Sequence, residues 1–108
     1  MSVAKENFIK TIYHLEQRDD ANTRPGNVAK ALGISSAAAT DMARKLAERD
    51  FIHYRKYQQL KLTDKGRKMA VNVLRKHRLW ETFLHQTFGL SLHEIHREAE
   101  LLELFGLP

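Results

Sequence analysis

Imidazole and carboxylate groups recur at helical spacing in the last third of this 108-residue chain. His77 and Glu81 stand four residues apart, so on a helix their side chains lie on the same face. The other residues of that face are apolar, and an ionisable pair buried among them needs a partner, because leaving it unpaired costs several kcal/mol. These apolar neighbours are Ala70, Val73, Leu74, Leu84 and Phe88.

A second group of the same chemistry lies in the segment HEIHREAELLEL, residues 93–104. At about 100° per residue, Glu100 lies about 40° to one side of His96 and Glu103 about 20° to the other. The three therefore form one narrow stripe, which borders an apolar face instead of facing bulk water. That apolar face contains Leu92, Ile95, Ala99 and Leu102.

Together the two stripes offer two imidazoles and three carboxylates on two helices that are expected to pack together. Such a set fits a divalent metal ion: Mn²⁺ and Fe²⁺ suit these ligands, and Zn²⁺ or Co²⁺ would bind in vitro. The alternative is that His77–Glu81 and His96–Glu100 are internal hydrogen-bonded pairs that hold no metal. Spacing alone leaves both interpretations open.

Helical periodicity predicts the elements that would position these groups. A long helix is expected to begin after Thr63, its N-cap, and to run to about Thr87, where Gly89 ends it. Ser91 is expected to cap a last helix that runs to about Leu104.

Three further elements are expected upstream. The segment ENFIKTIYHLEQ predicts a first helix, and residues 26–51 predict two short helices joined at Gly33, with Ser35 capping the second. The alternation in FIHYRKYQQLKLT indicates a hairpin with a basic, aromatic tip. The predicted fold class is mainly α: a winged helix-turn-helix over residues 1–63, then a helical dimerisation and metal-binding region over residues 64–108.

The net charge of +5 is distributed unevenly along the chain. Residues 24–78 carry fourteen Lys and Arg against four acidic residues, whereas residues 79–108 carry one Arg against five Glu. Because the basic excess coincides with the helix-turn-helix, the expected partner is double-stranded DNA. One such unit makes few contacts, so a homodimer on a palindromic site is expected.

The second helix of a helix-turn-helix enters the major groove, and here its outward side chains are mostly small. Ser36, Ala37 and Thr40 would approach the bases, and Asp41 would accept from a cytosine amine or discriminate against wrong contacts. Arg44 and Lys45 would reach phosphates, and the hairpin tip would straddle the backbone. The predicted DNA-binding residues are Ser35, Ser36, Ala37, Thr40, Asp41, Arg44, Lys45, Arg55, Lys56 and Tyr57.

Large apolar side chains in the last 30 residues exceed what one small core needs, and a dimer interface is expected among Trp80, Phe83, Phe88, Leu92 and Leu102.

Membrane proteins, secreted proteins and enzymes are disfavoured as classes for this chain. No apolar run approaches the roughly 20 residues of a membrane span, the N-terminus lacks a signal-peptide pattern, and the absence of Cys fits the cytoplasm. An enzyme is not expected, because there is neither a nucleophile–base constellation nor a phosphate loop.

The sequence resembles the metal-dependent repressors of the diphtheria toxin repressor and manganese transport regulator family. The resemblance runs through ENFIKTIYHL, VAKALGISSAAATDMARKL, LKLTDKGRKMA, RKHRLWETFL and IHREAELLE. It implies a cytoplasmic dimer that binds Mn²⁺ or Fe²⁺ as corepressor and then binds palindromic operators of metal-uptake genes. The family's ancillary metal ligands fall on His77, Glu81 and His96, and its primary ligands fall on Asn7, Glu100, Glu103 and Leu104.

Leu104 departs from this pattern, because family members typically carry a ligating His there. The resemblance thus predicts a chain that is truncated, or internally shortened near residues 100–104, without room for a C-terminal SH3-like domain. Two rival functions follow: a winged-helix DNA-binding protein without metal control, and a winged-helix module for protein interactions.

Overall fold

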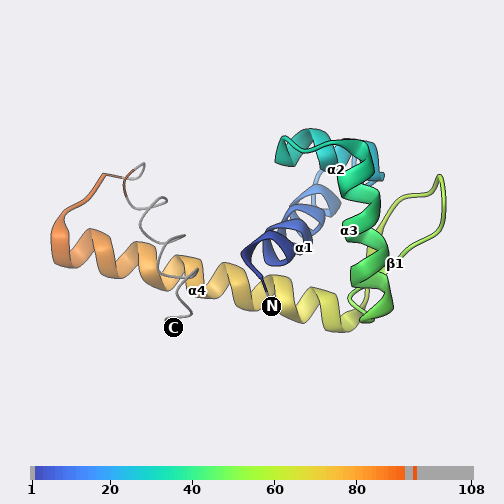
Figure 1. Cartoon of the computed structure of the whole chain (residues 1–108). Coiled ribbons are helices and arrows are strands. Elements are labelled where there is room, and N and C mark those ends of the chain that lie inside the picture. Colours follow the sequence, from blue (N-terminus) through green and yellow to red (C-terminus); the bar gives the residue numbers. More distant parts are fainter. Residues whose placement is uncertain (1, 92–93, 95–108) are drawn as a thin grey trace.

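The computed structural model describes residues 2–91 and residue 94 of the chain. Figure 1 shows one long helix, α4, with the other elements gathered against its N-terminal half. The order along the chain is α1 (Val3–Glu16), α2 (Pro25–Leu32), α3 (Ser36–Glu48), β1 (Ile52–His53), β2 (Lys61–Leu62) and α4 (Asp64–Phe88). The predicted mainly α fold, with a winged helix-turn-helix at its N-terminal end, is confirmed.

Four helix boundaries lie at residues that the sequence predicted as caps, whereas the N-caps Ser2 of α1 and Arg24 of α2 were not predicted. The hydroxyls of Ser35 and Thr63 each accept from the amide three residues further on, at 3.0 Å, ahead of α3 and α4. Gly33 and Gly89 end α2 and α4 in the left-handed conformation, with φ angles of 70° and 65°. Local chemistry therefore sets the start of α3 and both ends of α4.

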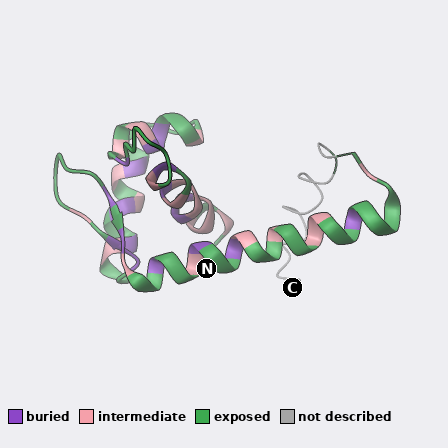
Figure 2. Ribbon diagram, turned by 180° about the vertical axis from the view of Figure 1, so that it is seen from behind, coloured by how far each residue is buried: buried purple, intermediate pink, exposed green. Residues whose placement is uncertain are grey.

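One apolar core joins α1, α2, α3 and the N-terminal half of α4. Phe8 and Ile12 of α1, Val28 of α2 and Leu46 of α3 are at most 1 % exposed. Ala70 and Val73 of α4 are also buried, and Figure 2 shows α1 lying beside the N-terminal half of α4. Because this core takes up one side of each short helix, the other side of α3 is left to solvent.

The hairpin, residues 52–62, is called the wing below. Its strands pair antiparallel with Ile52 opposite Leu62 and His53 opposite Lys61. Pairing stops after two residues because the next amide, that of Leu60, donates to the Thr23 carbonyl at 3.0 Å instead of to the partner strand. The wing is thus a short ladder with a long basic loop, tied at its base to the segment before α2.

The last predicted helix lies outside the described residues except for its start, where the Ser91 hydroxyl accepts from the Glu94 amide at 3.3 Å. Also outside the described residues are the predictions for Leu92, His96, Glu100, Leu102, Glu103 and Leu104. Among the helices that the structure does describe, none is both long and apolar enough to cross a membrane.

Candidate nucleic-acid interface and metal-ligand pair

One side of α3 is anchored and the opposite side is open. Ala39, Ala43 and Leu46 are 0 % exposed and hold the helix in the core. The open side carries every α3 residue predicted to meet DNA: Ser36, Ala37, Asp41, Arg44 and Lys45 are exposed, as is the cap Ser35, and Thr40 is partly exposed.

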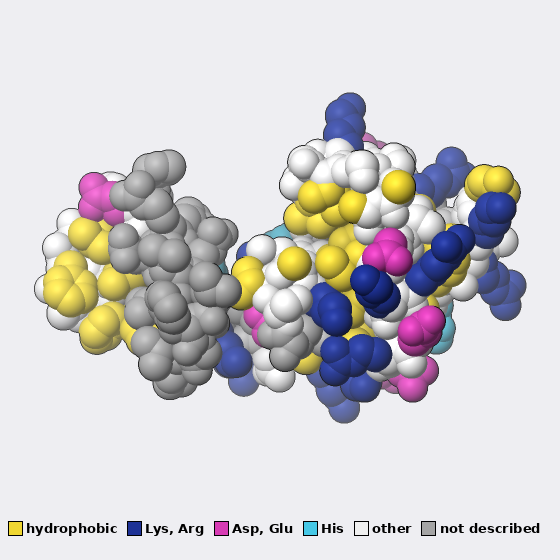
Figure 3. Space-filling view, viewed as in Figure 1, with side chains coloured by type: hydrophobic (Ala, Val, Ile, Leu, Met, Phe, Trp, Pro, Cys, Tyr) yellow, Lys and Arg dark blue, Asp and Glu magenta, His cyan; other side chains and the backbone are white. Residues whose placement is uncertain are grey.

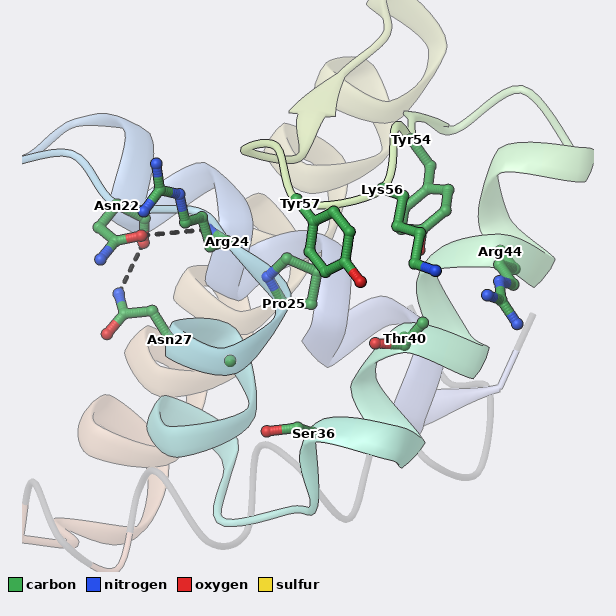
Figure 4. A pocket seen from close by; sticks show the side chains of 11 residues that line it. Asn22, Arg24, Pro25, Asn27, Ser36, Thr40, Arg44, Tyr54, Lys56 and Tyr57 are labelled. Carbon is green, nitrogen blue, oxygen red and sulfur yellow. Dashed lines mark hydrogen bonds between the residues drawn. The ribbon is translucent and has the colours of Figure 1, made fainter.

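One edge of this open side, made of Ser36, Thr40 and Arg44, forms one wall of a groove of about 660 Å³. Figure 4 shows the other walls, which are the start of α2 and the loop of the wing, whose two tyrosine rings project over the space between the helices. The residues that line the groove are Asn22, Arg24, Pro25, Gly26, Asn27, Ser36, Thr40, Arg44, Tyr54, Lys56 and Tyr57.

The wing brings cations and aromatic rings together at the mouth of this groove. The Arg44 guanidinium lies 5.9 Å from the centroid of the Tyr54 ring, so α3 and the wing are linked through a cation–π contact. The Lys56 ammonium lies 5.1 Å from the centroid of the Tyr57 ring. Tyr57 is 83 % exposed at a φ of 64°, a strained conformation of the kind found at binding sites. Arg55, the remaining predicted residue of the tip, is exposed.

The start of α2 is the wall that sequence reasoning missed. Arg24 is the N-cap and Pro25 the first residue of this helix, and the amide groups there carry a partial positive charge. The Asn22 side chain accepts from the Arg24 amide at 3.2 Å, and the Asn22 carbonyl accepts from the Asn27 side chain at 2.6 Å. The signal was present in the segment NTRPGN, since Pro at a first helical position marks a helix start.

Positive charge and a patch of apolar side chains lie at opposite ends of the molecule. Figure 3 shows Lys and Arg gathered over α3, the wing and the nearby end of α4, whereas hydrophobic side chains gather at the far end of α4. A groove with cationic walls, amide groups and stacking rings can bind the sugar-phosphate backbone and bring α3 to the edges of bases.

The predicted metal ligands on α4 form a close pair. His77 Nε2 lies 2.6 Å from Glu81 Oε1, and the two side chains are only 12 % and 28 % exposed. An imidazole nitrogen beside a carboxylate oxygen fits a metal ion of intermediate hardness, so the donors present suit Mn²⁺ or Fe²⁺. Among the described residues no third His or acidic side chain joins them, and Asn7 is a partly exposed residue of α1.

The far end of α4 carries three of the aromatic residues predicted for a dimer interface. The Trp80 and Phe83 rings meet edge to face at 5.6 Å, and the Phe83 and Phe88 rings do so at 6.0 Å. Phe83 is 47 % exposed and Phe88 is 62 % exposed, although the sequence placed Phe88 in the apolar stripe beside His77. Leu79, which the sequence analysis did not single out, is 61 % exposed on the same helix.

These features define a class: a DNA-binding winged helix-turn-helix whose long following helix carries a closely paired imidazole and carboxylate and an apolar end. Two family models match almost the whole chain. "Iron dependent repressor, N-terminal DNA binding domain" covers residues 1–60, and "Iron dependent repressor, metal binding and dimerisation domain" covers residues 63–105. The chain belongs to this family of metal-dependent transcriptional repressors.

Named relatives agree with this assignment. The HTH-type transcriptional regulator MntR of Geobacillus kaustophilus is 35 % identical over 91 % of this chain and 68 % of its own length. The diphtheria toxin repressor of Corynebacterium glutamicum is 32 % identical over 87 % of this chain, but this chain spans only 41 % of that protein. The solved structure of the manganese regulator SloR is 37 % identical, with a TM-score of 0.77 over 92 % of this chain and 46 % of that one.

Proposed function

We propose that this chain is a metal-responsive repressor that binds palindromic operator DNA as a homodimer and so controls metal-uptake genes. The observation that carries the proposal is the groove between α2, α3 and the wing, with the basic loop and the open side of α3 on its walls. The names of the relatives, an HTH-type transcriptional regulator, a diphtheria toxin repressor and a manganese regulator, support the same activity. The activity is binding without catalysis, and we place it in the cytoplasm.

In the proposed complex, α3 enters the major groove and presents Ser36, Ala37 and Thr40 to the bases. Their short side chains let the helix approach closely and let methyl groups pack against thymine. Arg44 and the wing residues Arg55 and Lys56 contact phosphates on the flanks, and these contacts fix the register of the helix. The division at residues 63 and 64, between a DNA-reading unit and a helical regulatory unit, is part of this proposal.

The metal would be held by His77, Glu81 and His96 at one site and by Asn7, Glu100 and Glu103 at the other. Bound Mn²⁺ or Fe²⁺ supplies a fixed positive charge with a defined coordination shell. The protein's own part is to hold His77 and Glu81 one turn apart, within contact of each other, on a helix that packs against α1. DNA binding requires an arrangement of α1, α4 and the following segment that places the two copies of α3 in the dimer one DNA turn apart. Metal can favour DNA binding only if it binds this arrangement more tightly than the alternatives.

The dimer interface is proposed at the apolar end of α4, formed by Trp80, Phe83 and Phe88 with Leu92 and Leu102. Exposed aromatic side chains gathered at one end of a helix mark an association site more often than a solvated surface. This end is far from the basic groove, so a twofold axis there leaves both copies of α3 free to meet DNA (Figure 3).

The proposal is tested by duplex binding with and without metal. Duplexes selected from a random pool at low salt are titrated with the protein in EDTA and in Mn²⁺, for the wild type, His77→Ala and His14→Ala. His14 is an exposed residue of α1 and serves as the matched control. Mn²⁺ is expected to raise the affinity of the wild type and of His14→Ala by about 5- to 150-fold, but not that of His77→Ala.

Thermal unfolding gives a second reading of the same variants. Mn²⁺ at about 100 times its dissociation constant should stabilise the wild type by about 2.7 kcal/mol and leave His77→Ala unchanged. Operator binding that is equally tight in EDTA and in Mn²⁺ would identify a repressor without metal control. Failure to bind any duplex at low salt would favour a protein-interaction module.

A further inference from the structure

We propose that Asp41 selects a cytosine in each half of the operator, with Lys45 as the counter-charge that lets a carboxylate approach DNA. This inference rests on the proposed function and adds to it the identity of one base that the protein reads.

The first observation is the place of Asp41 on α3. It is the sixth residue of the helix, and its side chain is 64 % exposed. Residues in the N-terminal half of a recognition helix are those that touch base edges. One turn earlier, Ala37 and Ala38 are exposed and short, so no larger side chain stands between Asp41 and an approaching duplex. Asp41 does not line the groove beneath the wing, and at about 100° per residue it lies on the side of α3 opposite the buried Ala39 and Ala43. This side, called the crest of α3 below, is the one furthest from the core.

The chemistry of a carboxylate limits the bases with which it can pair. An ionised carboxylate only accepts hydrogen bonds, and the major groove presents donors only at the amines of cytosine and adenine. In adenine the amine stands beside the N7 acceptor, which repels the second carboxylate oxygen, whereas the cytosine amine has no acceptor next to it on its own base edge. Guanine and thymine offer acceptors alone. A carboxylate on the crest therefore favours cytosine and disfavours the other three bases.

The third observation is the partner of Asp41. Lys45 Nζ lies 2.9 Å from Asp41 Oδ2, one helical turn further on. The carboxylate has about four lone-pair positions, so this contact leaves it able to accept from a base. The ammonium offsets the repulsion between the carboxylate and nearby phosphates, which otherwise opposes any acidic residue at this interface. Glu48, the other acidic residue of α3, lies at its last position.

The test is a comparison of base preferences. Duplexes are selected from a random pool with Mn²⁺ present, using the wild type, Asp41→Asn, Asp41→Ala and Lys45→Ala. The control is Asp20→Asn, which makes the same charge change at an exposed position in the segment after α1. The selected motifs are then checked by titration of duplexes that carry all four bases at the position in question, and by thermal unfolding of each variant.

The wild type and Asp20→Asn should prefer cytosine at one position of each half-site by about tenfold. Asp41→Asn should move that preference to adenine, because an amide pairs with adenine N6 and N7, and Asp41→Ala should lose the preference at that position alone. Lys45→Ala should keep the preference for cytosine but bind all sequences more weakly. The slope of log affinity against log salt concentration should fall by about one per protomer, because one phosphate contact is lost.

Three outcomes overturn the inference or its basis. If Asp41→Asn selects the same motif as the wild type, Asp41 reads no base. If both Asp41 variants bind every duplex more tightly by one common factor, Asp41 is only a repulsive charge. If the wild type enriches no motif at all, the proposed function itself fails, which is a different result from a motif that lacks the cytosine.

Discussion

At the scale of single residues, Gly66 shows how closely α4 approaches Phe51, the residue just before the wing. It lies in the first turn of α4, and a Cβ built there would fall well inside van der Waals contact of the Phe51 carbonyl oxygen. That carbonyl accepts from the Thr63 amide at 3.1 Å, so it cannot move away without breaking the link that starts α4. The absence of a side chain at residue 66 is therefore a packing requirement.

Gly66→Ala is expected to lower the free energy of unfolding by about 3 kcal/mol. The new methyl group would clash with a backbone carbonyl, which cannot turn away as a flexible side chain could. Urea denaturation followed by circular dichroism measures the change. The matched control is Gly26→Ala, because a Cβ at residue 26 meets only the Ser36 hydroxyl, at 4.0 Å. The control should be neutral or gain up to about 1 kcal/mol from helix propensity. Equal destabilisation of both variants would contradict the packing argument.

At the scale of elements, the wing depends on one buried hydroxyl. Thr23 is 2 % exposed and comes from the segment before α2, yet its hydroxyl donates to the Leu60 carbonyl at 2.6 Å. The backbone repeats the link, because the Leu60 amide donates to the Thr23 carbonyl at 3.0 Å. These bonds hold the base of the wing beside α2, and so they set the width of the groove between α2, α3 and the wing.

Thr23→Val is expected to cost about 1–3 kcal/mol, because the Leu60 carbonyl loses its side-chain donor in a buried setting. Amide exchange at Leu60 should accelerate more than exchange in the core, and affinity for the selected duplex should fall as the wing loosens. Thr87→Val, at an exposed position near the end of α4, is the control and should change stability by less than about 0.5 kcal/mol. Unchanged exchange at Leu60 in Thr23→Val would show that the backbone link alone fixes the wing.

At the scale of the whole molecule, the apolar end of α4 decides the oligomeric state in the proposed function. Leu79, Phe83 and Phe88 are between 47 % and 62 % exposed. Surface of this kind at the end of a helix, remote from the groove beneath the wing, is expected to be covered by a second copy of the chain.

Phe83→Asp is expected to shift the protein to a monomer in sedimentation velocity, because a charge at the centre of an apolar interface loses its hydration there. Affinity for a palindromic duplex should then fall, while affinity for a single half-site stays unchanged. Thr82→Asp adds the same charge one residue earlier, at an exposed polar position, and should remain dimeric. A dimeric Phe83→Asp protein would place the interface elsewhere.

Several parts of the fold and of the site were predictable because their causes lie within a few residues of each other. Ser35 and Thr63 act as caps through a hydroxyl and an amide three residues away. The pairing of His77 with Glu81 follows from a spacing of four residues on a helix, and the structure brings the two side chains to 2.6 Å. The metal-binding and DNA-binding roles of these residues stay predictions.

The sequence by itself determined the order of the helices, the open side of α3 and the basic region formed by α3 and the wing. It did so through short-range periodicity, capping and charge. Only the tertiary structure decided what faces that region. Arg24 and Tyr54 line one groove with Ser36 because α2 packs against α3 and the wing is tied back through Thr23. The physical reason is range: a cap or a helical stripe depends on neighbours along the chain, whereas the walls of a groove depend on contacts between segments tens of residues apart, which no local pattern records.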